Sequence, residues 1–203
     1  MHKDITGAIL AGGKSTRMGE DKAFMTVRGM TIIEFLYREM TSVFERVIII
    51  SNEPEKFLFL NAEVFPDIYS GIGPLAGIHS ALVQASTETV FVIPCDAPLL
   101  TPQIFEQIIN VNSEKPITYC HGGGFTQHLI GMFSKRLLPD MENILGSDTV
   151  QANGAAVTNC SIGEFINNHE HEVIEFPLSD YPTEFLNLNS KKDFEQLQLL
   201  LSL

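Results

Sequence analysis

The sequence predicts an α/β fold in which a mostly parallel central sheet is covered by helices on both faces. Short β-branched segments alternate with segments of helical periodicity. Residues 46–51 contain the apolar run VIII, and residues 89–94 (TVFVIP) are also largely apolar without alternation, which is typical of strands buried on both faces. The chain has 203 residues, of which 44 % are hydrophobic and 19 % charged, as expected of a folded protein. This length fits a single domain spanning residues 1–203.

The first half of the chain contains most of the strong patterns. A first strand is expected at residues 6–10, followed by a loop rich in small residues. Thr31 and Glu34 have the spacing of a capping box, and apolar residues at helical spacing follow them. Gly73-Pro74 interrupts the chain before another helix. The remaining predicted elements are strands at 46–51, 63–65 and 89–94 and helices at 54–60, 75–85 and 102–111.

The second half is less regular. Strands are expected at residues 117–120 and 129–133, on either side of a turn formed by Gly122–Gly124. Residues 136–186 are less periodic and more acidic. Ser190-Lys-Lys-Asp193 resembles a second capping box and predicts the start of the last helix.

The distribution of charge limits the ligands that this chain can bind. The chain carries 13 Lys and Arg against 25 Asp and Glu, a net charge of −12. That charge excludes a broad electrostatic surface for nucleic acid or for an anionic membrane. Residues 1–136 hold 11 of the basic residues and 14 acidic ones, whereas residues 137–203 hold 2 and 11. A small anionic ligand is therefore expected in the first two-thirds.

The cysteines and the apolar segments indicate a cytoplasmic protein. Cys95, Cys120 and Cys160 are odd in number and form no CxxC pair. The apolar run in residues 1–10 is too short for a signal peptide, and no segment reaches the length of a membrane span.

The loop after the first strand has the composition of a phosphate-binding loop. Gly12 and Gly13 lack Cβ atoms, so backbone N–H groups can approach phosphate oxygens closely. Lys14, Arg17 and Lys22 place three positive charges within nine residues. Arg17 can bind a phosphate with two parallel hydrogen bonds, while Lys22 acts as a movable point charge.

Two other interpretations of this loop compete with that one. Residues 8–15 nearly match the Walker A pattern, with Ala8 where glycine is required. We favour a different loop, because Ile9 and Leu10 continue the strand where a P-loop needs small residues. The simplest alternative is an ordinary turn whose basic residues are incidental.

Several motifs together resemble a known family. LAGGKSTRMGEDK at residues 10–22 resembles the signature of nucleotidyltransferases with a Rossmann-like core. Further matches follow in the family's order: Ser51-Asn52, Phe65-Pro66-Asp67, Gly73-Pro74-Leu75-Ala76-Gly77, Pro94-Cys95-Asp96-Ala97-Pro98 and Phe185-Leu186-Asn187-Leu188-Asn189. The combination is most similar to the molybdenum cofactor guanylyltransferases of MobA type, and it covers nearly the whole chain.

The resemblance implies a fold, an activity and partners. It implies a three-layer, Rossmann-like nucleotidyltransferase fold, with residues 1–115 binding the nucleotide and residues 116–203 the acceptor. The implied reaction transfers GMP from GTP to the terminal phosphate of molybdopterin and releases pyrophosphate, with Mg²⁺ as cofactor. Other cofactor-biosynthesis or acceptor proteins are candidate partners; nucleic acid and membranes are not expected.

The resemblance also implies roles for individual residues. Arg17 and Lys22 are expected to offset the charge that develops on the phosphates, and Asp96 to hold Mg²⁺; these three are the expected catalytic residues. The expected binding residues are Leu10, Ala11, Gly12, Gly13, Lys22, Asn52, Asp67, Asp96, Asn187 and Asn189. Of these, Gly12 and Gly13 would cradle the triphosphate, and Leu10, Asn52 and Asp67 would contact the nucleoside.

Each polar candidate also has a purely structural interpretation. Asp96 could cap or form the turn before the helix near Pro102, and Asp67 could be a turn residue. Asn52 could simply end a strand. Asn187 and Asn189 alternate with leucines, which predicts a short strand with both amides on one side. Such a strand could equally be an edge strand with a polar face.

The second half departs from the family in two ways. Gln127-His128-Leu129 stands where the family often has Gln-Pro-Leu after an arginine, and here Phe125 and Thr126 precede it. No arginine follows Arg136. These departures keep two alternatives open: a cytidylyl- or sugar-phosphate nucleotidyltransferase, and a non-catalytic nucleotide-binding module. His169-Glu-His171 is interpreted as an exposed surface segment rather than a metal site.

Overall fold

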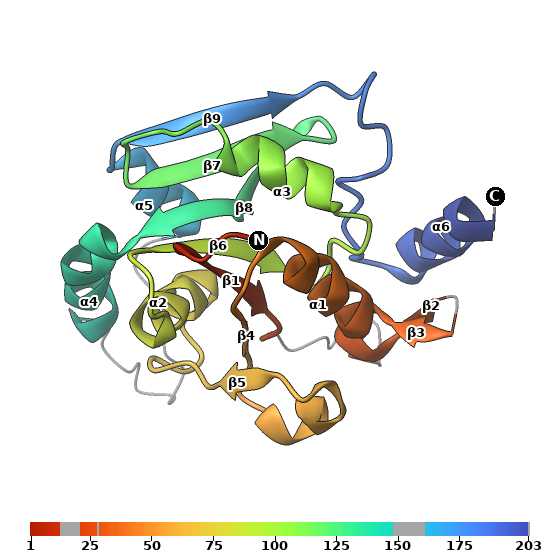
Figure 1. Ribbon diagram of the computed structural model, residues 1–203, viewed down its shortest axis with the longest axis horizontal. Helices are drawn as coiled ribbons and strands as arrows, with labels where there is room; N and C mark the ends of the chain where they lie inside the picture. Colours follow the sequence, from red (N-terminus) through yellow and green to blue (C-terminus); the bar gives the residue numbers. More distant parts are fainter. Residues whose placement is uncertain (13–20, 28, 148–160, 203) are drawn as a thin grey trace.

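A seven-stranded sheet forms the centre of the computed structural model, which describes residues 1–12, 21–27, 29–147 and 161–202 (Figure 1). The strand order is β5-β4-β1-β6-β8-β7-β9. The strands are β1 (Ile5–Leu10), β4 (Val47–Ile50), β5 (Glu63–Phe65), β6 (Thr89–Pro94), β7 (Ile117–Gly122), β8 (Phe125–Ser134) and β9 (His171–Phe176). Within this sheet β8 alone runs against the other strands. The predicted mostly parallel sheet is therefore confirmed.

Helices cover both faces of the sheet. Successive residues of a strand point to opposite faces, so each inner strand contributes side chains to two cores. In β1, Ile9 packs into a core with α1 (Ile32–Val43) and α3 (Pro102–Ile109). Its neighbour Leu10 packs into a second core with α2 (Pro74–Gln84), α4 (Leu138–Ser147) and α5 (Ile162–Asn167). The last helix, α6 (Lys191–Ser202), adds Leu197 to the first core. These two cores explain why the β1, β4 and β6 segments are apolar without alternation.

Local sequence signals set the helix boundaries. The hydroxyl of Thr31 accepts a hydrogen bond from the N–H of Glu34, whose carboxylate accepts one from the N–H of Thr31. The predicted capping box of α1 is thus confirmed. Proline occupies the first turn of both α2 and α3, where its missing N–H costs nothing. Residues 54–60 form a 3₁₀ helix, η2.

Several elements were not expected from the sequence. Lys22–Phe24 form a short 3₁₀ helix, η1, and a small hairpin follows, made of β2 (Thr26–Val27) and β3 (Met30–Thr31). The irregular region 136–186 contains α4, α5 and β9. In β9 only Phe176 is buried, so its sequence lacks the apolar pattern of the inner strands. No helix in the described ranges is both long enough and apolar enough to cross a bilayer.

The parallel strands bring several loops together at one edge. The chain leaves β1 at Ala11, β4 at Ser51 and β6 at Cys95, all at the carboxyl ends of neighbouring strands. The N–H of Ala11 donates to the carbonyl of Ile50, and the N–H of Cys95 donates to the carbonyl of Leu10. These bonds extend the sheet into the loops and fix where each loop begins.

Gly131 provides a test of the β7–β8 pairing, whose register shifts between Tyr119 and Cys120. A Cβ at Gly131 would overlap the carbonyl oxygen of Thr118 and lie 2.7 Å from the Cα of Tyr119. Since both contacts are with backbone, Gly131→Ala should lower the free energy of unfolding by about 2–4 kcal/mol. Urea denaturation measures this change.

Gly146 in α4 is the matched control, because a Cβ at this position would lie more than 4 Å from the other described parts of the chain outside its own helical backbone. Gly146→Ala should raise stability by about 0.5–1 kcal/mol, since alanine favours the helix. Equal stability of the two variants would show that the β7–β8 geometry is wrong.

Candidate active site

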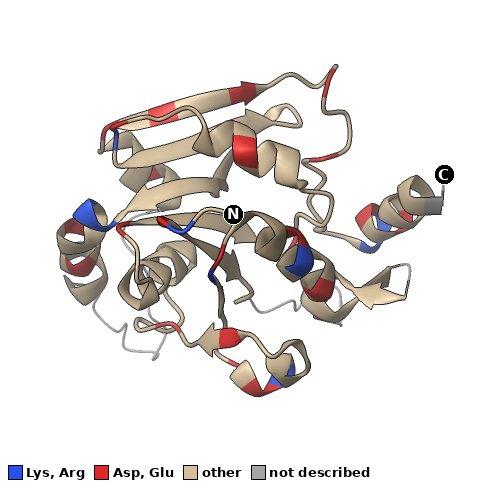
Figure 2. Ribbon diagram, viewed as in Figure 1, with Lys and Arg blue, Asp and Glu red and all other residues tan. Residues whose placement is uncertain are grey.

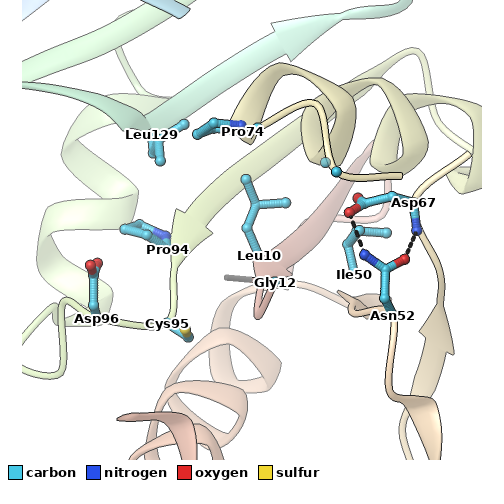
Figure 3. Close-up of a pocket in the computed structure, with 13 residues that line it drawn as sticks. Leu10, Gly12, Ile50, Asn52, Asp67, Pro74, Pro94, Cys95, Asp96 and Leu129 are labelled. Carbon is cyan, nitrogen blue, oxygen red and sulfur yellow. Dashed lines mark hydrogen bonds between the residues drawn. The ribbon is translucent and has the colours of Figure 1, made fainter. Parts of the chain in front are cut away.

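A cavity of about 640 Å³ lies at the carboxyl edge of the sheet (Figure 3). Ligands of open α/β sheets bind at this edge. The cavity is lined by Leu10, Gly12, Ile50, Asn52, Asp67, Gly71, Gly73, Pro74, Gly77, Pro94, Cys95, Asp96 and Leu129. Five of the ten residues expected to bind are among them: Leu10, Gly12, Asn52, Asp67 and Asp96. Gly13 and Arg17 lie outside the described residues.

Asn52 and Asp67 form a hydrogen-bonded pair on one side of the cavity (Figure 3). The amide nitrogen of Asn52 donates to Asp67 Oδ2 at 2.8 Å, and the N–H of Asp67 donates to Asn52 Oδ1 at 3.0 Å. Burial raises the pKa of Asp67, although the hydrogen bond from Asn52 opposes this effect. The pair therefore presents a fixed carboxylate and amide to the cavity.

The start of α2 forms the wall beside this pair. Gly73 adopts a φ of +93°, which a residue with a side chain rarely adopts. A Cβ at Gly77 would lie 3.3 Å from Leu10 Cδ2 and 3.7 Å from Asp67 Oδ1. The absence of a side chain at Gly77 thus lets Leu10 and Asp67 approach the helix closely.

Lys22 and Asp96 meet near the opposite side of the cavity. Asp96 follows β6, and its Oδ2 lies 3.9 Å from Lys22 Nζ. Lys22 Nζ also donates to Asn189 Oδ1 at 3.4 Å, and its side chain is 17 % exposed. Burial raises the pKa of Asp96, and the positive charge of Lys22 lowers it. Thr101, not Asp96, is the N-cap of α3, so the helix-cap interpretation of Asp96 is wrong.

Asn187 and Asn189 are not on a strand, so that prediction is wrong. The backbone between them bonds to a loop instead of a strand: the N–H of Leu188 donates to the carbonyl of Asp96 at 2.8 Å. The two amides consequently have different partners. Asn187 Nδ2 donates to Gln127 Oε1 at 3.3 Å, whereas Asn189 accepts from Lys22. These contacts join residues 185–189 to the cavity's edge.

Asp96 has the chemistry of a magnesium ligand. Mg²⁺ in nucleotide enzymes commonly takes one or two carboxylates together with phosphates and water. Among the residues that the structure describes, no three His, Cys, Asp or Glu side chains come together as a protein-only metal site. Asp96 faces the cavity and has Lys22 beside it, which fits a cation bound jointly by protein and phosphates.

Cys95 and the histidine pair have structural roles. Burial raises the pKa of Cys95 to about 12, so the thiol stays protonated at neutral pH and is not a nucleophile. His169 contacts the carbonyl of Phe165 and the carboxylate of Asp140, and His171 contacts backbone carbonyls. Glu170 is exposed, but both histidines are partly buried, so the interpretation of His169-Glu-His171 as an exposed surface segment is confirmed only in part.

Comparison with known proteins identifies the family. The family described as MobA-like NTP transferase domain matches residues 7–158. This chain belongs to it. The resemblance drawn from the motifs is therefore confirmed, and the chain is a nucleotidyltransferase by family.

Similar proteins cover almost the whole chain. A protein of Carboxydothermus hydrogenoformans, named probable molybdenum cofactor guanylyltransferase, is 33 % identical over 99 % of this chain and 98 % of its own. The molybdenum cofactor guanylyltransferase of Aliivibrio fischeri is 32 % identical over 98 % of each chain. The crystal structure of molybdopterin-guanine dinucleotide biosynthesis protein A from Archaeoglobus fulgidus has a TM-score of 0.78 at 18 % identity, covering 97 % and 98 %. That structure confirms the fold class.

The raised pKa of Asp67 predicts a pH-dependent cost in stability. The cost is absent below the ordinary carboxyl pKa of about 3.9 and sets in as pH rises through the raised folded-state pKa. Asp67→Asn removes the charge and keeps an acceptor for Asn52. Its Tm should exceed that of the wild type at pH 7, and the difference should shrink toward about pH 4.

Asp4→Asn, at an exposed carboxylate before β1, controls for the loss of one negative charge. Calorimetry from pH 4 to 8 measures both variants. A Tm of Asp67→Asn at or below that of Asp4→Asn at pH 7 would contradict the assigned cost.

Proposed function

We propose that this chain is a molybdenum cofactor guanylyltransferase, which transfers GMP from GTP to the terminal phosphate of molybdopterin. The observation that carries the proposal is the cavity, which has the hydrogen-bonded Asn52–Asp67 pair on one side and the Lys22–Asp96 pair near the other. The names of the full-length relatives support the choice of nucleotide and acceptor.

The nucleoside is proposed to lie against Leu10 and the Asn52–Asp67 pair. Leu10 offers an apolar side chain, while the amide and carboxylate can bind the base edge or the ribose hydroxyls. Gly12 lies between this pair and Asp96, as Figure 3 shows. Among the described residues, Asp67 Oδ2 comes nearest to where a Cβ of Gly12 would stand, at 3.8 Å, so these residues leave room there for a phosphate. Gly13 would continue this cradle.

In the proposed reaction, an oxygen of the molybdopterin phosphate attacks the α-phosphorus of GTP. The new P–O bond forms as the bond from the α-phosphorus to its bridging oxygen breaks, and pyrophosphate leaves with the electron pair. Little covalent chemistry falls to the protein in such transfers, so positioning and charge neutralisation dominate. Lys22 and Arg17 are proposed to supply positive charge to the phosphates. Asp96 would hold Mg²⁺, which neutralises phosphate charge when bound.

The acceptor is proposed to bind in residues 116–203, beside the amides of Gln127 and Asn187. Figure 2 shows acidic residues on β9 and α6 in this part of the chain. The side chain of His121 in β7 lies 2.9 Å from the carboxylate of Glu175. This histidine therefore already has an acidic partner within the protein. Neutral amides can bind the polar edge of a pterin without a matching charge. We place the enzyme in the cytoplasm, where this cofactor chemistry would occur.

Nucleotide preference tests the proposed function. Binding of GTP, CTP, UTP and ATP with Mg²⁺ is compared by calorimetry, and pyrophosphate release is then measured with and without molybdopterin. GTP should bind at least about tenfold more tightly than the others, because a polar site rejects bases whose groups leave it unpaired. Pyrophosphate should appear only when molybdopterin is present.

Two results would contradict the proposal in different ways. A preference for CTP would support a cytidylyltransferase. Tight GTP binding without pyrophosphate release in the presence of molybdopterin would support a non-catalytic module.

A further inference from the structure

The side chain of Lys22 is held by a residue far along the chain. Its Nζ donates to Asn189 Oδ1 at 3.4 Å, across a separation of 167 residues. The same Nζ lies 3.9 Å from Asp96 Oδ2. Lys22 itself sits in the three-residue helix η1, which offers little rigidity to a long side chain. The position of the ammonium group therefore depends on Asn189.

The backbone of Asn189 is in turn held by Asp193. Asp193 Oδ2 accepts the N–H of Asn189 at 2.8 Å and the N–H of Ser190 at 2.7 Å. The N–H of Asp193 donates to Ser190 Oγ at 3.3 Å, which completes the predicted capping box of α6. One carboxylate oxygen thus fixes two consecutive backbone groups next to Lys22.

The ionised form of Asp193 suits this role. Burial works against ionisation, but the hydrogen bonds from Asn189 and Ser190 and the charge of Lys22 together lower the pKa of Asp193. The carboxylate is therefore charged at neutral pH and accepts both N–H groups strongly.

Helix α6 gives Asp193 a fixed base. Leu197 is fully buried in the core shared with α1. Leu197 and Leu201 also line a second cavity, of about 220 Å³, together with Phe35 of α1 and Val27 of the β2–β3 hairpin. On its other side the segment is tied to the site, because Leu188 donates to the carbonyl of Asp96. Asp193 therefore connects a helix that is anchored through Leu197 to the cavity's edge.

We propose that Asp193 is a positioning residue: it fixes Asn189, whose amide oxygen holds the Lys22 ammonium beside Asp96. Asp193 touches no substrate, and it acts through Asn189 and Lys22. The assignment rests on the proposed role of Lys22 in nucleotidyl transfer. It makes α6, outside the cavity, a part of the catalytic arrangement.

Three variants separate positioning from simple helix capping. Asp193→Ala removes both bonds, whereas Asp193→Asn keeps an acceptor oxygen. Glu164→Ala removes the corresponding carboxylate from the capping box of α5, where it accepts the N–H of Ser161. Asp193→Ala and Glu164→Ala should lower Tm by a similar 2–4 °C, roughly what the loss of a cap costs.

The kinetic expectation differs between the two caps. Asp193→Ala should lower kcat for GMP transfer about 10- to 100-fold, as expected when a catalytic group is displaced by about 1 Å, with little change in the KM for molybdopterin. Asp193→Asn should recover most of this loss, and Glu164→Ala should keep the wild-type kcat. Equal kcat values for Asp193→Ala and Glu164→Ala would overturn the proposal.

A variant pair tests whether Asp193 acts through Lys22. In a Lys22→Ala background, Asp193→Ala should lower kcat no further, because the group it positions is already absent. A further loss of about tenfold or more in that background would show that Asp193 acts elsewhere.

A readout without turnover distinguishes this proposal from the proposed function. The side-chain ¹⁵N signal of Lys22, assigned by its loss in Lys22→Ala, should shift in Asp193→Ala and stay in place in Glu164→Ala. If the wild type transfers no GMP, the proposed function fails, but the signal still reports on Asp193. An unchanged Lys22 signal in Asp193→Ala would overturn the positioning role.

Discussion

Parallel pairing of β4, β1 and β6 is the constraint on which the site depends. It forces the loops that begin at Ser51, Ala11 and Cys95 to leave the sheet at one edge. Residues that are tens of positions apart in the sequence, such as Leu10, Asn52 and Asp96, therefore line the same cavity. Leu129 of the antiparallel β8 lines this cavity from the other half of the chain. The hydrogen bond from Leu188 to the carbonyl of Asp96 joins the two halves.

The cavity in which GTP is proposed to bind contains two acidic side chains, Asp67 and Asp96, in a chain of net charge −12. Burial raises the pKa values of both Asp67 and Asp96, so keeping them ionised costs folding free energy. Asn52 offsets part of this cost on one side and Lys22 on the other. The proposed Mg²⁺ would change Asp96 from a repulsive neighbour of phosphate into a ligand. Such a bound cation would allow a strongly acidic protein to bind an anion.

The sequence predicted best those features that local patterns determine. Asp96 could be placed at the carboxyl edge because it lies just after a predicted strand, whereas Asn52 and Asp67 were assigned to the nucleoside from the family resemblance. The capping boxes at Thr31 and Ser190 were equally visible. By contrast, β9 is exposed and polar, so no hydrophobic pattern marked it. The strand predicted at residues 187–189 failed because a tertiary bond to Asp96 fixes that backbone. The contact between Lys22 and Asn189 spans 167 residues, and no local pattern could reveal it.

In the proposed complex, the Lys22–Asp96 end of the cavity receives the phosphates of GTP and the Asn52–Asp67 end receives the nucleoside. Titration of GTP binding against Mg²⁺ in the wild type, Asp96→Asn and Asp67→Asn tests this polarity most directly. We expect Asp96→Asn to lose most of the Mg²⁺ dependence, with affinity at saturating Mg²⁺ about tenfold weaker or more. Asp67→Asn should bind GTP more weakly and keep the wild-type Mg²⁺ dependence. Identical Mg²⁺ titrations for Asp96→Asn and the wild type would contradict the claim.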